Sequence, residues 1–286
     1  MASGQWPTAG GAKRRPTRFA PGTKPPTMPL GHSSPTFLDP TPMNAPQLRP
    51  SCRARLLKRC WEASLKLFLD TAHLADIETA TGWGILEGIT TNPTLAAKEG
   101  LEFHDLIRAI TNVVSGPVSA EVVSDNRDDM VAQGQVLRTI ADNVVVKVPM
   151  TREGVAAGAR LVEMGHPINV TLVFSAAQAI LAATIGATFV SPFLGRVDDV
   201  GNDSLALLTE IVDVYAAQGY DTQVLAASLR HPQHVVQSAR IGADAATMPF
   251  AVMDKLFDHP LTDIGNERFN RDWEAYQQAL SVRRAK

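Results

Sequence analysis

The stretch Asn143-Val-Val-Val-Lys-Val-Pro-Met-Thr151 contains the pattern from which the fold follows. A short run of valines closed by turn residues is typical of a strand buried on both faces of a parallel sheet. The next segment, 152–164, has helical periodicity and is closed by Gly165. The stretch therefore indicates a strand followed directly by a helix.

The same strand-and-helix unit recurs along the chain from Leu65 onward. Helical periodicity separates eight predicted strands, for example in 103–114, 127–140, 152–164, 176–185, 203–217 and 233–241. The strands are predicted at 66–70, 88–91, 118–122, 144–148, 168–173, 189–192, 223–227 and 245–248. Strands joined by helical crossovers pair in parallel, and eight such units in this length favour a closed (β/α)8 TIM barrel. No Gly-x-Gly-x-x-Gly follows the first strand, which disfavours the alternative of an open, doubly wound sheet.

The first 64 residues differ in composition from the rest of the 286-residue chain. They hold 11 of the 19 prolines and ten Lys/Arg against two acids, a charge of +8, while the remainder carries −10. Such a segment buries too little apolar surface to offset its ordering entropy, so we expect residues 1–64 to be a disordered extension. An organelle transit peptide and a true start of translation at Leu65 are the alternatives. The second domain is then 65–286, a barrel with a C-terminal helical tail.

Composition also limits where the protein works and what it binds. Both cysteines, Cys52 and Cys60, lie in the extension, so the predicted barrel has neither a disulfide nor a thiolate metal site. No apolar run approaches the roughly 20 residues of a membrane span, so we expect a cytoplasmic protein with no membrane partner. The acidic balance of the barrel argues against nucleic acid. The pair His231-x-x-His234 is interpreted as helix surface, and we expect no metal or cofactor.

Polar side chains gather at the carboxyl ends of the predicted strands, where barrels of this type carry out their chemistry. Each has an ordinary structural alternative: Asp70 and Asn92 suit helix N-caps or turns, and Arg196 suits a surface ion pair with Asp198 or Asp199. The candidates are Asp70, Thr90, Asn92, Glu121, Lys147, Asn169, Thr171, Ser191, Phe193, Arg196, Ser228 and Arg230.

Glu121 and Lys147 differ from the other candidates because each interrupts an apolar strand. Charged side chains at such positions are seldom buried without a partner, so a structural ion pair between them is one interpretation. The functional interpretation uses burial directly: an ammonium among valines loses solvation, and the neutral amine becomes available as a nucleophile. A lysine amine of this kind captures a carbonyl substrate as a Schiff base.

Schiff-base chemistry needs proton carriers, and the predicted rim supplies candidates for them. Glu121 and Asp70 are suited to divide the acid and base roles, and Thr171 to hold a relaying water. Two guanidinium groups and a hydroxyl, those of Arg196, Arg230 and Ser228, fall at the ends of consecutive strands and suit a phosphate. We therefore expect a phosphorylated substrate.

These residues occur in motifs that resemble the transaldolase family over residues 65 to about 275, in particular its small single-barrel branch, which also contains fructose-6-phosphate aldolase. The resemblance implies that Lys147 is the Schiff-base lysine, Asp70 the acid/base at the C4 hydroxyl, and Glu121 with Thr171 the pair that positions the catalytic water. It further implies that Asn92, Asn169 and Ser191 hold the dihydroxyacetone portion, and that Arg196, Ser228 and Arg230 bind phosphate. The motifs are Phe68-Leu-Asp-Thr71, Gly88-Ile-Thr-Thr-Asn-Pro93, Val145-Val-Lys-Val-Pro149, Asn169-Val-Thr171, Ser191-Pro-Phe-Leu-Gly-Arg196 and Ala226-Ala-Ser-Leu-Arg230.

Two positions favour transaldolase over the aldolase within this family. The aldolases tend to carry glutamine in place of Glu121 and tyrosine in place of Phe193, and a glutamate, unlike a glutamine, can shuttle a proton. Leu229 stands where phenylalanine is expected. The implied reaction passes a dihydroxyacetone unit from sedoheptulose 7-phosphate or fructose 6-phosphate to glyceraldehyde 3-phosphate or erythrose 4-phosphate. Fructose-6-phosphate aldolase and a non-catalytic sugar-phosphate binding barrel are the alternatives.

The tail of the chain carries three aromatic residues, Phe269, Trp273 and Tyr276, at spacings of four and three. This spacing places them on one face of a helix. The stripe packs either on its own barrel or on a neighbouring subunit. The resemblance implies a homo-oligomer, up to a decamer.

Overall fold

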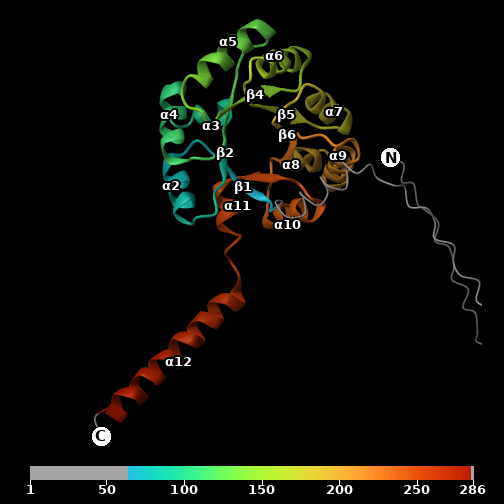
Figure 1. The fold of residues 1–286 in the computed structure, drawn as a ribbon. Helices are drawn as coiled ribbons and strands as arrows, with labels where there is room; N and C mark the ends of the chain where they lie inside the picture. Colours follow the sequence, from blue (N-terminus) through green and yellow to red (C-terminus); the bar gives the residue numbers. More distant parts are fainter. Residues whose placement is uncertain (1–63, 285–286) are drawn as a thin grey trace, which may run out of the picture. The chain divides into compact units, whose positions relative to one another are not determined.

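The computed structural model describes residues 64–284, and their strands form one closed barrel (Figure 1). Every strand pairs in parallel with the next, and β8 pairs with β1 to close the ring. The predicted barrel is confirmed, and each observed strand lies within one residue of its predicted bounds. The strands are β1 (Lys66–Asp70), β2 (Gly88–Thr90), β3 (Val118–Glu121), β4 (Val144–Pro149), β5 (Ile168–Val173), β6 (Phe189–Pro192), β7 (Gln223–Ala226) and β8 (Ala245–Met248).

Helices follow the strands and surround the barrel (Figure 1). Polar side chains cap several of their N-termini: Thr151, for example, accepts a hydrogen bond from Gly154 N–H at the start of α6. Gly219 and Gly242 end α9 and α10 in the left-handed conformation that glycine adopts most readily. The helices are α2 (Leu74–Gly82), α3 (Pro93–Ala96), α4 (Phe103–Val113), α5 (Arg127–Arg138), α6 (Arg152–Glu163), α7 (Ala176–Thr184), α8 (Leu194–Asp199), α9 (Ser204–Gln218), α10 (Pro232–Ile241), α11 (Phe250–Asp254) and α12 (Pro260–Arg284).

The middle of the barrel interior is apolar. Its buried cluster is built around the rings of Phe68 and Phe189, whose centroids lie 5.9 Å apart in an edge-to-face arrangement. Gly88 makes room for this pair, because a Cβ there would lie 2.6 Å from the Phe68 ring. A larger apolar core fills the space between the strands and the helices. Functional side chains are thereby confined to the carboxyl end of the strands.

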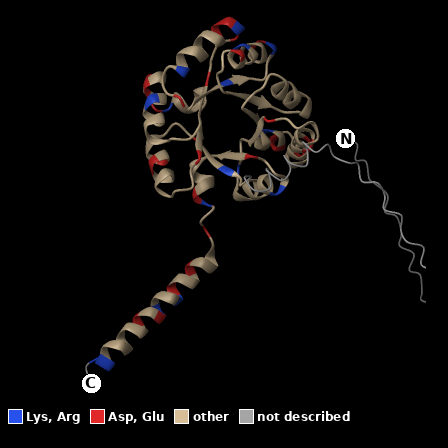
Figure 2. Ribbon diagram, in the orientation of Figure 1, with Lys and Arg blue, Asp and Glu red and all other residues tan. Residues whose placement is uncertain are grey.

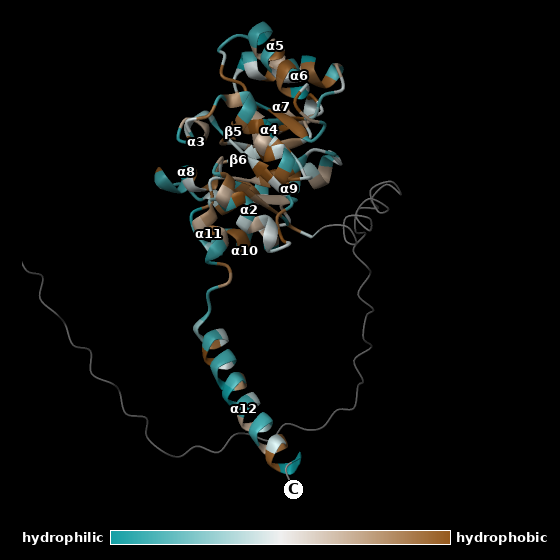
Figure 3. Ribbon diagram, turned by 90° about the vertical axis from the view of Figure 1, so that its left-hand side faces the viewer, coloured by the Kyte–Doolittle hydropathy of each residue, from teal (hydrophilic) through white to brown (hydrophobic). Residues whose placement is uncertain are grey.

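Charged and apolar residues are distributed according to the two layers of the barrel, the inner strands and the outer helices. Lys, Arg, Asp and Glu lie mostly on the outer helices (Figure 2), and the most apolar residues gather in the strands and the helix faces against them (Figure 3). Within residues 64–284, no helix is both long enough and apolar enough to cross a bilayer.

Among residues 64–284, two non-glycine residues have positive φ angles, and both lie at carboxyl ends of strands. Leu172 in β5 and Ser228 after β7 each have φ of 60°. The β5–β6 register shifts between Val170 and Val173, so Leu172 sits in an irregular step of the ladder. Such conformations cost about 1 kcal/mol or more and tend to occur at functional sites.

The chain ends in the 25-residue helix α12, which has no buried residue. Its aromatic side chains Phe269, Trp273 and Tyr276 are all more than half exposed. Packing of this stripe on the chain's own barrel is therefore not observed. The predicted extension at 1–64 falls, except for its last residue, outside the described part of the chain.

Candidate active site

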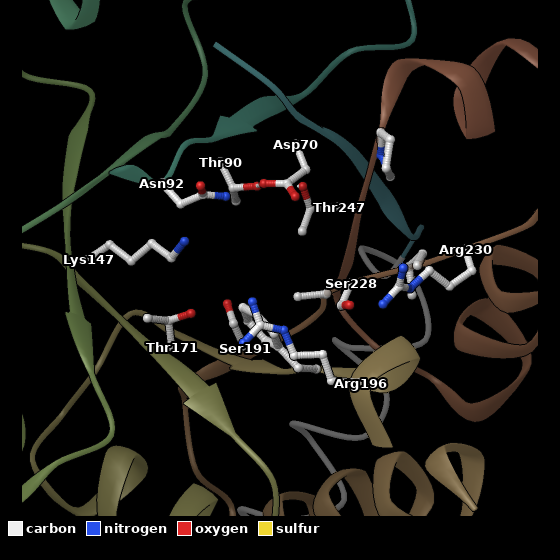
Figure 4. A pocket seen from close by; sticks show the side chains of 14 residues that line it. Asp70, Thr90, Asn92, Lys147, Thr171, Ser191, Arg196, Ser228, Arg230 and Thr247 are labelled. Carbon is white, nitrogen blue, oxygen red and sulfur yellow. Dashed lines mark hydrogen bonds between the residues drawn. The ribbon is translucent and has the colours of Figure 1, made fainter. Parts of the chain in front are cut away.

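A pocket opens at the carboxyl ends of the strands and brings ten of the twelve candidate residues together (Figure 4). The two exceptions, Glu121 and Asn169, lie behind the pocket wall and contact residues that line it. The pocket is lined by Asp70, Thr90, Asn92, Lys147, Thr171, Ser191, Phe193, Arg196, Ala227, Ser228, Leu229, Arg230, Thr247 and Pro249.

Lys147 extends from β4 toward the centre of the pocket (Figure 4). Its Nζ lies 2.9 Å from Glu121 Oε2 and donates to the Thr91 carbonyl oxygen at 2.9 Å. The β3–β4 register places Glu121 beside Lys147, and the Glu121 side chain is only 14% exposed. Both groups accept hydrogen bonds from the Lys147 nitrogen and hold it at the pocket wall. The adjacent carboxylate is placed to accept its proton.

Two threonine hydroxyl groups form a hydrogen-bonded chain that ends on Asp70, at the carboxyl end of β1. Thr90 Oγ1 donates to Asp70 Oδ1 at 2.8 Å, and Thr247 Oγ1 lies 2.7 Å from Thr90 Oγ1. When Asp70 is ionised, the Thr90 proton is committed to it, so Thr247 must donate to Thr90. Burial raises the pKa of Asp70 above its usual value, while the charge of Lys147 and the Thr90 hydrogen bond oppose that rise.

Thr247 is a site residue that the sequence analysis missed. It is the one hydroxyl-bearing residue of the otherwise apolar strand β8, near that strand's carboxyl end. The same rule of polar groups at strand ends would have identified it.

Asn169 is fully buried in β5, and both polar atoms of its amide bond neighbouring side chains. Its Nδ2 donates to Ser119 Oγ at 3.2 Å, and its Oδ1 accepts from Ser191 Oγ at 2.8 Å. Ser191 lines the pocket, whereas Asn169 does not. Asn169 therefore orients the Ser191 hydroxyl from behind.

The hydroxyl of Thr171 is buried and has no hydrogen-bond partner among residues 64–284. It faces the pocket close to Lys147 in Figure 4, just before the irregular step at Leu172. Buried hydroxyl groups are almost always bonded, and the exceptions call for an explanation. A donor or acceptor brought by a bound molecule would satisfy this one.

Asn92 is the helix N-cap of its structural interpretation, and it also lines the pocket. Its Oδ1 accepts from Leu95 N–H at 3.0 Å and so caps α3, and the same residue lines the pocket. The cap fixes the orientation of the side-chain amide at the pocket edge.

Cationic groups occupy the side of the pocket across from Lys147 (Figure 4). The Arg196 guanidinium stacks on the Phe193 ring at 5.1 Å, and Arg230 pairs with Asp199 at 2.7 Å. The surface ion pair considered for Arg196 is not among the ion pairs of residues 64–284. Arg196 and Arg230 thus present positive charge to the same opening, as an anionic group requires.

Comparison with known proteins connects this geometry to a family. The model of the family "Transaldolase/Fructose-6-phosphate aldolase" matches residues 67–283. The chain belongs to this family.

Relatives within the family match the barrel over nearly their full length. "Probable transaldolase 1" of Listeria monocytogenes is 52% identical over 211 residues, which are 74% of this chain and 99% of the relative. A "Probable transaldolase" of Methanococcus vannielii is 51% identical over 212 residues, again 74% and 99%. One of Aquifex aeolicus is 52% identical over 210 residues, 73% and 97%.

In this transaldolase-family chain one of the two histidines, His234, differs from the sequence interpretation. His231 is the N-cap of α10, but His234 is only 6% exposed, so its assignment to the helix surface is wrong. Its Nε2 lies 3.1 Å from Asp198 Oδ2, and its Nδ1 accepts from Arg230 N–H at 3.3 Å. Nowhere in residues 64–284 do three His, Cys, Asp or Glu side chains cluster as metal ligands do.

Proposed function

We propose that the protein is a transaldolase that carries a dihydroxyacetone unit on Lys147 as a Schiff base. The observation that carries the proposal is a buried lysine whose amine reaches the pocket and whose proton has an adjacent acceptor, 2.9 Å away on Glu121. No other standard side chain provides a primary amine for covalent capture of a ketone. An ion pair kept only for stability has no need of a pocket.

The first half of the reaction begins with transfer of the ammonium proton to Glu121. The Lys147 amine then adds to the ketone carbon of the donor sugar, and the carbinolamine loses its hydroxyl as water with a proton returned by Glu121. Thr171, whose hydroxyl lacks a partner among the described residues, holds the water in this exchange. The product is a cationic iminium that withdraws electrons from the adjacent carbon–carbon bond.

Asp70 then takes the proton of the C4 hydroxyl. The C3–C4 bond breaks, its electrons neutralise the iminium to an enamine, and the aldose leaves with a new carbonyl. The enamine adds to the acceptor aldehyde, Asp70 returns its proton to the new hydroxyl, and hydrolysis of the iminium frees the product. A carboxyl whose pKa is raised by burial suits a group that must both take and return a proton.

The distribution of charge supports a phosphorylated sugar. Arg196 and Arg230 lie opposite Lys147, so one substrate placed between them has its carbonyl near the amine and its anionic end near the guanidinium groups (Figure 4). Ser191, oriented by Asn169, and Asn92 lie along the intervening wall, where they bind substrate hydroxyls. The substrates proposed are sedoheptulose 7-phosphate, fructose 6-phosphate, glyceraldehyde 3-phosphate and erythrose 4-phosphate.

Transfer is favoured over release of free dihydroxyacetone by the residues around Phe193. A phenylalanine has no hydroxyl group with which to activate water, and the Phe193 ring is held between the Arg196 guanidinium and Phe174. Fructose-6-phosphate aldolase activity is the second candidate. It predicts turnover of fructose 6-phosphate without any acceptor aldehyde.

Borohydride trapping tests the covalent step directly. Protein incubated with fructose 6-phosphate and borohydride should gain the mass of a reduced three-carbon unit, and peptide mapping should place it on Lys147. The Lys147→Met protein should gain nothing. Binding of the sugar phosphate without any adduct would point instead to a non-catalytic barrel.

We further propose a homo-oligomer, up to a decamer, built in part through α12. The helix carries an apolar face, Phe269, Trp273 and Tyr276, that no part of its own described chain covers. Faces of this kind are usually covered by a partner. Light scattering should show a multimer that Trp273→Lys reduces in size, and a monomeric wild type would contradict the proposal.

The proposed location is the cytoplasm. Sugar phosphates are charged metabolites that do not diffuse through membranes, so their enzyme must lie where they are formed. Cell fractionation with an antibody to the native protein tests this location.

A further inference from the structure

Two separate segments supply the cations of the proposed phosphate site. Arg196 lies on α8, which follows β6, and Arg230 lies in the loop between β7 and α10. The segments meet backbone to backbone: Gly195 N–H donates to the Ser228 carbonyl oxygen at 3.0 Å. A Cβ on Gly195 would lie 2.3 Å from that oxygen, so the contact depends on glycine.

His234 joins the same two segments with its imidazole ring. Its Nδ1 accepts the backbone N–H of Arg230, and its Nε2 lies 3.1 Å from Asp198, two residues after Arg196. Asp198 also accepts from Ser204 N–H at 3.3 Å, which ties the junction to the start of α9. Because a backbone N–H can only donate, the ring must be neutral with its proton on Nε2.

We propose that His234 is a positioning residue for the phosphate site, which holds the Arg230 loop against α8 only while its imidazole is neutral. This inference rests on the proposed function, since it assigns Arg196 and Arg230 to phosphate binding. When the ring is protonated, Nδ1 becomes a donor and meets the Arg230 N–H as a second donor. The loop that contains the positive-φ residue Ser228 then loses its hydrogen bond to the ring at Arg230.

The surroundings of His234 set the pH at which this release occurs. Burial lowers the pKa of His234, and the neighbouring His231 and Arg230 lower it further, while Asp198 opposes them. The His231 ring lies 3.9 Å from the His234 ring between centroids. The neutral ring therefore prevails at pH 7, and phosphate affinity falls as the medium becomes acidic.

Two substitutions separate the contacts of the ring. His234→Asn keeps an acceptor near the Nδ1 position and loses the contact with Asp198, whereas His234→Gln keeps a donor near Nε2 and loses the contact with Arg230. The matched control is His104→Asn, since His104 is an exposed histidine of α4 paired with Glu102. Each protein is assayed with fructose 6-phosphate and with unphosphorylated fructose, from pH 5 to pH 8.

We expect His234→Gln to raise KM for fructose 6-phosphate about five- to tenfold at pH 7.5, as loss of one buried hydrogen bond predicts, with kcat little changed. KM for fructose should stay as in the wild type. The wild-type KM for fructose 6-phosphate should rise as pH falls, and this rise should be flatter in His234→Asn. Titration of the substrate phosphate itself affects every variant alike, so the difference between proteins reports the imidazole.

A further variant tests the charge around the ring. Asp198→Asn removes the negative charge that favours the imidazolium, so the acid rise in KM should move to lower pH. If His234 served only to stabilise the fold, Asp198→Asn would not shift the pH at which KM rises.

Calorimetric titration with inorganic phosphate gives a readout that needs no turnover. Weaker phosphate binding by His234→Gln than by the wild type supports the inference even if transfer activity proves absent, an outcome that would defeat the proposed function alone. Equal phosphate affinities, together with superimposable pH profiles for wild type and His234→Asn, would overturn the inference and leave the proposed function standing.

Discussion

Replacing Lys147 with methionine removes one half of a buried ion pair and leaves Glu121 and the Thr91 carbonyl oxygen without their donor. Glu121 can avoid a buried, unpaired charge by taking up a proton. An unperturbed glutamate has a pKa of about 4.3, so neutralising it at pH 7 costs at most about 3.7 kcal/mol. This limit agrees with the roughly 3–5 kcal/mol lost when one partner of a buried pair is removed.

The cost should depend on pH with a definite sign. Above pH 4.3 the variant must bind a proton on folding, so its loss of stability grows by about 1.4 kcal/mol per pH unit. Near pH 4 only the cost of the unpaired Thr91 carbonyl oxygen remains, and that cost does not depend on pH. At pH 7 a loss of about 3 kcal/mol lowers Tm by roughly 6–12 °C in a barrel of this size. Adding Glu121→Gln should restore stability to within about 1 kcal/mol of the wild type, while transfer activity stays absent in both variants.

Denaturant unfolding at pH 5 and pH 7 measures these differences. The matched control is Lys66→Met, which removes a half-buried lysine whose partner, Gln223, is neutral, so its loss should not vary with pH. A loss for Lys147→Met that is equal at both pH values, or that Glu121→Gln does not restore, would refute the buried pair. Transfer activity in Lys147→Met would refute the mechanism.

Three further substitutions have defined outcomes. Thr247→Val removes the donor at the end of the hydroxyl chain, and we expect kcat to fall about two- to tenfold. The pH below which kcat declines should also move upward, and stopped assays across a range of pH would measure both changes. Asp70→Asn should abolish transfer yet raise Tm by about 2–4 °C at pH 7, because burial disfavours the ionised carboxyl. Since the pKa of Asp70 is raised in the folded protein, this gain in Tm should shrink as pH falls toward 4. A Tm difference that does not depend on pH would contradict this prediction. Gly195→Ala forces a Cβ against the Ser228 carbonyl oxygen and should raise KM for phosphorylated sugars tenfold or more, whereas Gly82→Ala, with open space around it, should leave KM unchanged.

The barrel was predictable because its strands are buried on both faces. Val144–Pro149 and the other seven strands are short, mostly apolar and bounded by turn residues, and that pattern can be seen in a single sequence. Helices α3, α8 and α11, of four to six residues, are too short to show a hydrophobic period, and the sequence analysis named none of them. Prediction therefore succeeded where the pattern repeats and failed where a helix has fewer than two turns.

The sequence predicted which residues belong to the candidate site, but not which of them line the pocket and which lie behind its wall. Strand alternation indicates which side chains point into a barrel, but it does not indicate which of them reach the open pocket. Asn169 and Thr171 are both inward residues of β5, yet Asn169 supports Ser191 from behind while Thr171 faces the pocket. Their difference depends on neighbouring strands and on the irregular step at Leu172.

The sequence by itself determined the chemistry available: a lysine among valines in one strand, carboxyl groups on nearby strands and arginines at later strand ends. Only the tertiary structure decided the partners, placing Lys147 2.9 Å from Glu121 and burying His234 between two segments that precede it in the chain. The physical reason is the range of the interactions. Hydrophobic period and capping are local and can be seen within one element, whereas hydrogen-bond partners and burial are set by barrel closure, which joins residues far apart in sequence.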